Sequence, residues 1–281
     1  PTGYGPAEVY DVAFSGARGD RIRAWYIRPP ASRADGPDGP DGLSPVVVKF
    51  IGYGGGRGRP ADHMLLPAVG YPLFVMDSRG QGGRWTIGAT GDLPGGGPEL
   101  SLVMTRGIDN PDDYYFTRLF TDAVRAVETA AELAGRSPVA VTGISQGGGL
   151  ALAAAGLLGD AVAVCHADVP FLCDIQRGIT IAPDAPYTEV ARFLAQQVDY
   201  ETSALDTLRY VDCALLARRI TAASLLSVGL MDTICPPSTV FAAYNEITAP
   251  KDIAVFSFGV HAVPPSHQER QLRHLREHFS A

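Results

Sequence analysis

Long apolar runs, paired cysteines and an excess of positive charge are all missing from this 281-residue chain. No stretch of about 20 apolar residues occurs, so we expect no segment that spans a membrane. The formal net charge of −7 argues against a surface that binds nucleic acid or an anionic membrane. The four cysteines, Cys165, Cys173, Cys213 and Cys235, form no CxxC pair. We therefore expect reduced, structural thiols and, with them, a reducing compartment.

Motifs for cofactors and metals are missing as well. The glycine-rich stretch FIGYGGGRG at 50–58 is not followed by the Gly-Lys-Ser/Thr of a P-loop. GISQGGG has no GxGxxG placed for a dinucleotide, and no HExxH or paired Cys/His cluster predicts a metal site. We therefore expect neither a cofactor nor a metal. The chain begins with Pro1 rather than Met and shows no signal-peptide pattern there.

What the chain does contain is enough apolar sequence for a sizeable core, with 46 % hydrophobic and 19 % charged residues. Its length fits a single α/β domain over 1–281. Residues 7–28 indicate two antiparallel strands around a Gly-Asp turn. From residue 46 short apolar runs bounded by turns predict strands covered on both faces, hence a mostly parallel sheet. These runs are VVVKFI, LFVMD, VAVTG, AVAVCH, SLLSVGL and IAVFSF.

Helical patterns separate these strands. The clearest helix is predicted to start with Asn110 as N-cap and Pro111 at its first position, and to close at Gly135. Between about 171 and 222 the strand pattern disappears and amphipathic helical pieces replace it. This predicts a helical insertion after the strand near 162–166. The alternation of strands and helices predicts a three-layer α/β domain with helices on both faces of the sheet.

The pentapeptide Gly143-Ile144-Ser145-Gln146-Gly147 matches the G-x-S-x-G nucleophile elbow, with an apolar strand before it and a helix after it. The chemistry needs the flanking glycines because the nucleophile sits on a sharp turn, where a side chain two residues away would collide with backbone. Such a turn exposes the Ser145 hydroxyl and directs the next N–H toward the developing oxyanion. The alternative is a strand that merely enters a helix through a glycine turn.

A serine nucleophile needs a histidine base and an acid that orients it. In this type of site the chain order is serine, then aspartate, then histidine. Asp232 comes just after SLLSVGL, at the carboxyl end of a predicted strand, where α/β sites form; the alternative is a turn-forming aspartate. His261 follows the last predicted strand, on a loop rich in proline, and is the candidate base. The other histidines fit less well, because they lie on the final helix or precede the aspartate: His267, His274, His278, His63 and His166.

The glycine-rich stretch at 50–58 ends an early strand, where the second oxyanion donor of such a site is expected. The Tyr53 N–H would be this donor, and the Gln146 N–H the other.

Several stretches also resemble carbohydrate esterase family 7, the acetyl xylan esterases and cephalosporin C deacetylases, which have the α/β-hydrolase fold. The resemblance covers almost the whole chain. The matching stretches are RGQGG at 79–83, TRGI at 105–108, YYFTRLFTDAVRAVE at 114–128, GISQGGGLALA at 143–153, DVPFLCD at 168–174 and SVGLMDTICPPSTVFAAYN at 227–245.

The resemblance implies the same nucleophile, acid, base and oxyanion donors: Ser145, Asp232, His261, Tyr53 and Gln146. It also implies a cytoplasmic, cofactor-free homo-oligomer, a hexamer in the family, that releases acetate from small acetylated substrates. Arg79, Gly80, Gln81 and Gly82 match the family's signature, in which we interpret Arg79 as a structural residue that holds loops near the elbow.

Two departures from the family stand out. The loop that starts at the base, His261, reads HAVPPSHQ, whereas in the family the base is followed by Glu and a run of glycines. Ala262 therefore replaces a carboxylate, and Pro264 and Pro265 stiffen the loop. The family's helical segment ahead of the first strands has no counterpart in the sequence. Two alternatives stay open, a serine hydrolase of other specificity (a longer-chain esterase or a peptidase) and a catalytically silent binding protein of this fold.

Overall fold

A computed structural model describes residues 3–5, 7–30, 45–92, 96–99 and 102–279. Its central element is an eight-stranded sheet with the order β1-β2-β4-β3-β5-β6-β7-β8. Strands β3 to β8 run parallel, whereas β1 pairs antiparallel with β2, and β2 with β4. The mostly parallel sheet and the N-terminal antiparallel pair are therefore confirmed. The strands are β1 (Glu8–Ser15), β2 (Arg21–Arg28), β3 (Val46–Phe50), β4 (Leu73–Met76), β5 (Val139–Ile144), β6 (Val162–Asp168), β7 (Ala223–Gly229) and β8 (Lys251–Phe256).

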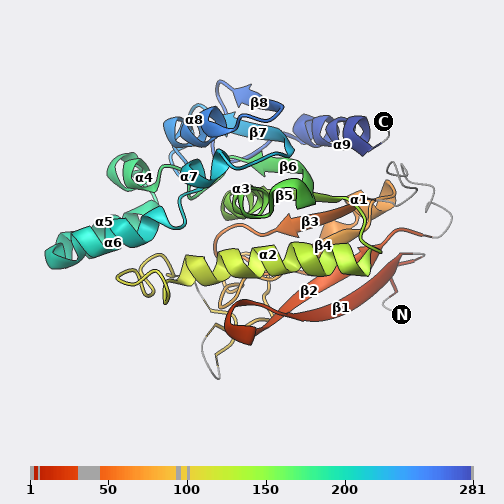
Figure 1. Cartoon of the computed structure of the whole chain (residues 1–281), viewed down its shortest axis with the longest axis horizontal. Coiled ribbons are helices and arrows are strands. Elements are labelled where there is room, and N and C mark those ends of the chain that lie inside the picture. Colours follow the sequence, from red (N-terminus) through yellow and green to blue (C-terminus); the bar gives the residue numbers. More distant parts are fainter. Residues whose placement is uncertain (1–2, 6, 31–44, 93–95, 100–101, 280–281) are drawn as a thin grey trace.

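Helices cover both faces of this sheet (Figure 1). The α-helices are α1 (Leu65–Ala68), α2 (Tyr115–Leu133), α3 (Gln146–Leu158), α4 (Ile175–Ile181), α5 (Tyr187–Gln196), α6 (Glu201–Arg209), α7 (Cys213–Ala217), α8 (Pro237–Glu246) and α9 (Pro265–Phe279). Short 3-10 turns are η1 (Ala17–Gly19), η3 (Pro60–His63), η4 (Gly159–Ala161) and η5 (Val198–Tyr200). Within the described ranges, none of the helices combines the length and apolarity needed to cross a membrane.

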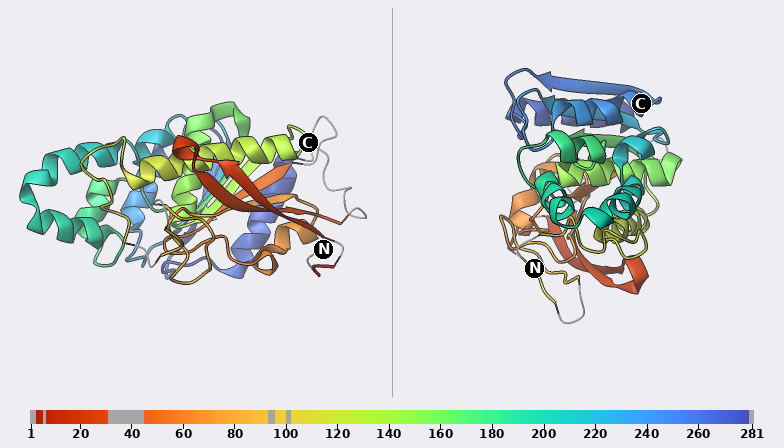
Figure 2. Two further views of the ribbon diagram at one scale, coloured as in Figure 1. Left: turned by 90° about the horizontal axis from the view of Figure 1, so that it is seen from below. Right: turned by 90° about the vertical axis from the view of Figure 1, so that its left-hand side faces the viewer.

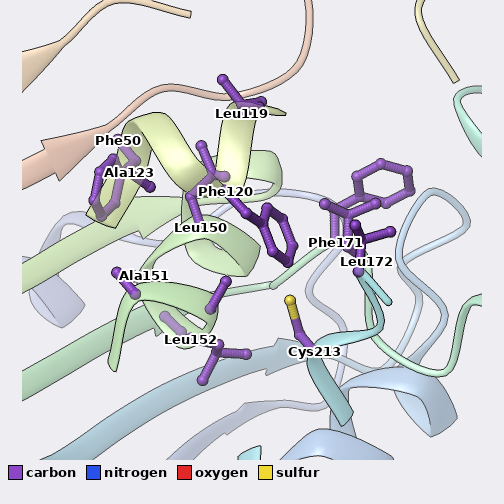
Figure 3. Close-up of a cluster of buried hydrophobic side chains, with 14 of the residues drawn as sticks. Phe50, Leu119, Phe120, Ala123, Leu150, Ala151, Leu152, Phe171, Leu172 and Cys213 are labelled. Carbon is purple, nitrogen blue, oxygen red and sulfur yellow. The ribbon is translucent and has the colours of Figure 1, made fainter. Parts of the chain in front are cut away.

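Successive side chains of β3 point to opposite faces of the sheet and so enter two separate hydrophobic cores. Val46, Val48 and Phe50 pack with α2 and α3 on one face, while Val47 packs with α9 through Leu275 on the other. Helix α3 is apolar or glycine all round after Gln146 and is almost wholly buried, as expected for a helix enclosed on every side. Figure 3 shows its leucines and alanines meeting α2 and the segment after β6.

The segment between β6 and β7 is helical, as predicted, and carries α4 to α7. Helices α5 and α6 extend beyond one end of the sheet, clear of its faces (Figure 2). All four cysteines are buried and free, as expected from their apolar surroundings.

The predicted start of the long helix is wrong by four residues. Helix α2 begins at Tyr115, not at Pro111, and Asn110 instead caps a separate turn by accepting the Asp112 N–H at 3.0 Å. Tyr114 is held in an extended conformation because its ring is fully buried and its hydroxyl donates to the Met104 carbonyl at 3.0 Å. Tertiary packing of one aromatic residue therefore overrides a local capping pattern.

Candidate active site

Ser145 lies at the turn between β5 and α3, and its backbone is strained. Its φ of 59° and ψ of −120° fall in a region that residues other than glycine rarely occupy, at a cost of about 1–3 kcal/mol. The surrounding fold holds this conformation: the Ser145 N–H donates to the Asp168 carbonyl at 2.9 Å, and its carbonyl accepts the Phe171 N–H at 3.0 Å. Backbone strain that the surrounding fold holds in place, as at Ser145, is common at functional positions.

The two glycines of the motif are required by close backbone approach. A Cβ at Gly143 would stand 2.3 Å from the backbone of Gly147, and a Cβ at Gly147 would stand 2.4 Å from the Phe50 carbonyl oxygen. Both distances are far below van der Waals contact. The turn thus packs directly against the end of β3, which places Ser145 beside the glycine-rich stretch that follows β3.

Asp232 and His261 form a pair, although 29 residues separate them. The Asp232 Oδ2 atom is 2.8 Å from His261 Nδ1, and the carboxylate is buried. Its other oxygen, Oδ1, accepts the N–H groups of Ile234 at 2.8 Å and Cys235 at 2.9 Å. This arrangement fixes the carboxylate, which in turn fixes the imidazole ring and favours a proton on Nδ1. The Nε2 atom is then available to accept a proton.

The His261 ring and Ser145 line one cavity of about 290 Å³, together with Tyr53, Arg84 and Trp85 among others. No hydrogen bond joins the Ser145 hydroxyl to His261 in the described structure, although such contacts often tighten only when substrate binds. The structure therefore brings the sequence-predicted serine, aspartate and histidine to one site.

Cys235 also lies next to this site, and a cysteine thiol is a second group that could act as a nucleophile. Its side chain is fully buried. Burial, together with the charge of Asp232, raises the pKa of its thiol well above the ordinary value, and a hydrogen bond with Ser145 offsets only part of this. A thiol in this state is a poor nucleophile. Cys235 therefore does not compete with Ser145.

Two backbone N–H groups are available for an oxyanion. Gln146 is the first residue of α3, so its N–H has no acceptor within the helix. Tyr53 follows β3 and lines the cavity, and none of the described residues accepts its N–H. The Tyr53 side chain is held in place, since its hydroxyl donates to Glu189 Oε2 at 2.8 Å and accepts the Val103 N–H at 2.8 Å.

Gln81 links the two segments that carry these donors. Its Oε1 accepts the N–H of Gly54, next to Tyr53, at 2.6 Å, and its Nε2 donates to Gln146 Oε1 at 2.9 Å. Nε2 also lies 2.7 Å from the Tyr115 hydroxyl. The side chain is fully buried. One amide therefore sets the spacing between the Tyr53 loop and the start of α3.

We expect Gln81→Leu to lower kcat by roughly 10- to 100-fold with little change in KM, because small displacements of stabilising groups are costly in the transition state. Steady-state kinetics on a chromogenic acetyl ester measures kcat and KM separately. The exposed Gln176→Leu is the matched control and should leave both constants unchanged. An effect on KM alone would contradict a positioning role.

Arg79 has the structural role predicted for it. Its guanidinium is fully buried and makes two hydrogen bonds to Asp122, at 2.6 and 2.8 Å, and one to Asp20 at 2.8 Å. Burial opposes its charge, but the hydrogen bonds and charge of Asp122, with that of Asp92, raise the pKa of the guanidinium above its ordinary value. The Arg79 carbonyl accepts the Tyr115 hydroxyl at 2.6 Å. Arg79 thus ties the loop after β4 to α2 and to the turn between β1 and β2.

Replacing Arg79 with methionine should lower the free energy of unfolding by about 3–5 kcal/mol, because the buried Asp122 carboxylate loses its main partner. Urea unfolding followed by circular dichroism measures the change. The double variant Arg79→Met/Asp122→Leu should recover part of the loss, since the uncompensated charge is gone. Arg125→Met removes an exposed ion pair with Glu128 and should have no measurable effect.

A second polar cluster, which sequence reasoning did not identify, joins β6 to α9. Asp168 Oδ1 is 2.8 Å from both Ser227 Oγ and His267 Nε2, and its Oδ2 accepts from Gln271 Nε2 at 2.9 Å. His267 and Gln271 are four residues apart on α9 and so share a face. The spacing of His267 and Gln271, together with an aspartate at the end of a central strand, could have indicated this cluster from the sequence. The cluster anchors the helix that follows the His261 loop.

A metal site is not found in the part of the chain that the structure describes, where no three His, Cys, Asp or Glu side chains are grouped to hold an ion.

Comparison with known proteins finds a family model and solved structures that match almost the whole chain. A family model described as acetyl xylan esterase (AXE1) matches residues 2–278. The acetyl xylan esterase from Paenibacillus sp. R4 superposes with a TM-score of 0.85 at 34 % identity, over 98 % of this chain and 85 % of that one. Acetyl xylan esterase 1 from Thermoanaerobacterium sp. JW/SL YS485 gives a TM-score of 0.82 at 34 % identity, with the same coverage.

One curated relative is a longer protein. The acetyl esterase Axe7A of Xylanibacter ruminicola is 33 % identical over 161 residues, which are 56 % of this chain and 35 % of that protein. The match thus spans about a third of the relative's length. An acylaminoacyl peptidase from Pyrococcus horikoshii, at 17 % identity and a TM-score of 0.66, shares the fold alone. These likenesses and the sheet order confirm the α/β-hydrolase fold predicted from the sequence.

Proposed function

Because the chain belongs to the acetyl xylan esterase family, a family of carboxylic ester hydrolases, we propose that it is a serine esterase that removes acetyl groups from small O-acetylated substrates. The observation that carries this proposal is that strained Ser145 and the Asp232–His261 pair line the same cavity. Acetylated xylo-oligosaccharides are the first substrate class, because two solved relatives are named acetyl xylan esterases. Cephalosporin C-like acetyl esters are the second, on the family resemblance.

In the acylation step His261 Nε2 takes the proton from the Ser145 hydroxyl, and the oxygen attacks the acetyl carbonyl carbon. The tetrahedral oxyanion accepts hydrogen bonds from the N–H groups of Tyr53 and Gln146, which are fixed before the reaction begins. Asp232 holds the imidazole in the required tautomer and stabilises its protonated form. His261 then donates the proton to the leaving alcohol, which leaves an acetyl group on Ser145.

In the deacylation step His261 takes a proton from water, and the resulting hydroxide attacks the acetyl-enzyme carbonyl. The same two N–H groups stabilise the second oxyanion. Collapse of this intermediate returns the proton from His261 to Ser145 and frees acetate. Because the acyl-enzyme mechanism needs only groups of this chain and water, we propose that the reaction uses neither a metal nor a cofactor.

Acyl chain length separates an acetyl esterase from the alternatives. We expect kcat/KM for p-nitrophenyl esters to fall steeply from acetate to butyrate and octanoate, and we expect no cleavage of aminoacyl anilides. Acetate release from acetylated xylo-oligosaccharides and from cephalosporin C then ranks the two substrate classes. A profile that rises toward octanoate would assign the site to a longer-chain esterase, and cleavage of the anilides would assign it to a peptidase.

A further inference from the structure

A second cavity, of about 260 Å³, lies on the sheet face that α1 and α9 cover. Leucines from both helices and from β4 form much of its wall: Leu65, Leu66, Leu73, Leu272 and Leu275. The proposed catalytic residues Ser145, Asp232 and His261 are not among the described residues that line it. A cavity of about 150 Å³ already holds benzene. This one therefore has room for a small organic ligand.

Lys49 is the lysine among the described residues of this wall, which also carries other polar side chains: Asp62, His63, Thr142, His166, Asp168, Gln268 and Gln271. It is one of only two lysines in the chain, the other being Lys251 on β8. Burial lowers the pKa of Lys49, and the charge of Asp62 opposes this shift. Its Nζ lies 3.3 Å from His63 Nδ1, and within the described ranges it forms no ion pair with a carboxylate. A lysine that lines a cavity without a carboxylate partner has an unused capacity to bind an anion.

His63 accounts for only one of the three N–H donors of Lys49. Burial, with the charge of Lys49, lowers the pKa of His63 to about 4, so the ring is neutral at pH 7. Its Nε2 lies 2.8 Å from the Arg57 carbonyl oxygen, to which it must donate. Its Nδ1 therefore carries no proton and accepts from Lys49. Among the described residues nothing else accepts from Lys49, so two of its ammonium donors remain for a ligand.

Both carboxylates on the cavity wall accept hydrogen bonds from groups other than Lys49. Asp168 accepts hydrogen bonds from Ser227, His267 and Gln271, which use both of its oxygens. Asp62 Oδ2 accepts the Arg59 N–H at 2.8 Å. Neither carboxylate forms an ion pair with Lys49, so an incoming anion would not displace a salt bridge.

We propose that this cavity binds a small aliphatic monocarboxylate of about six carbons, with the carboxylate on Lys49 Nζ and the alkyl chain against the leucines of α1, α9 and β4. The wall also carries Asp62 and Asp168, so it is the local ammonium of Lys49 that favours a carboxylate, and the leucines favour its alkyl chain. A bare inorganic anion would leave the leucines uncovered, and an uncharged alkane would leave the two lysine donors without an acceptor. The proposal is independent of the esterase mechanism, because it uses none of the same residues.

The scarcity of lysine gives a direct test. Protein labelled with ¹³C-lysine has only two side-chain Cε resonances, from Lys49 and Lys251. We expect hexanoate to shift one of them saturably, and this resonance is the one that Lys49→Met removes. The Lys251 ammonium donates to the Tyr244 carbonyl at 2.7 Å. Its resonance should therefore not move. Acetate and hexanol should bind at least about tenfold more weakly, because acetate lacks the alkyl chain and hexanol lacks the carboxylate.

Lys49→Met should weaken hexanoate binding by at least about tenfold in calorimetry, whereas Lys251→Met should leave it unchanged. If Lys49→Met does not fold, labelled Lys251→Met assigns the two resonances, and the titration of the labelled wild-type protein then decides the matter. The proposal is overturned if hexanoate shifts neither lysine or both equally. It is also overturned if hexanol binds as well as hexanoate, or if acetate or phosphate does.

Discussion

Replacing Ser145 with alanine is expected to lower the turnover of acetyl esters by roughly 10⁴-fold or more, because no other group at the site can form the acyl-enzyme. The buried Cys235 thiol cannot substitute, since its raised pKa keeps it protonated. The measurement is kcat/KM on p-nitrophenyl acetate, with freshly purified protein and a blank for spontaneous hydrolysis.

Ser266→Ala is the matched control, because this serine is exposed and lies in the first turn of α9, close in sequence to His261. It should behave as the wild type. Urea unfolding should show that Ser145→Ala folds, since the substitution removes one oxygen and leaves the turn's backbone hydrogen bonds in place. Wild-type turnover by a folded Ser145→Ala protein would exclude the proposed mechanism.

Asp232→Asn is expected to cost roughly 10⁴-fold in kcat, although it changes neither size nor fold. The Asp232 Oδ1 atom accepts the N–H groups of Ile234 and Cys235, so an asparagine would keep its carbonyl oxygen there. Its NH₂ group would then face His261 Nδ1 in place of Oδ2. The ring would have to carry its proton on Nε2, and in that tautomer it cannot accept a proton from Ser145.

Asp184→Asn is the control for Asp232→Asn. Asp184 is exposed and accepts from Thr233 Oγ1 at 2.8 Å, which an asparagine oxygen can also do, so activity should be unchanged. Loss of less than about tenfold in Asp232→Asn would mean that the tautomer of His261 does not depend on this residue.

The elbow, the strands and the Asp–His pair could be predicted from the sequence because each depends on short-range rules. Apolar runs between turns define parallel strands, and the carboxyl ends of such strands lie at one edge of the sheet. An aspartate after β7 and a histidine after β8 are therefore close to a serine after β5, whatever the intervening sequence. The glycines at 143 and 147 follow from the same turn, as the backbone distances show.

The features that could not be predicted depend on distant packing. The start of α2 is set by the burial of Tyr114, and nothing local to Asn110 reveals it. The anchoring of α9 through His267 and Asp168 joins residues 99 positions apart. Through these contacts Asp168 of β6 holds the helix that begins at Pro265, shortly after His261.

Covalent labelling of Ser145 tests the central claim most directly. A fluorophosphonate reacts only with a serine whose base and oxyanion donors are in place. Intact mass spectrometry should show one adduct per chain, and peptide mapping should place it on Ser145. Labelling should be lost in Ser145→Ala and be strongly slowed in Asp232→Asn. An unlabelled wild-type protein, or an adduct on any other serine, would contradict the account.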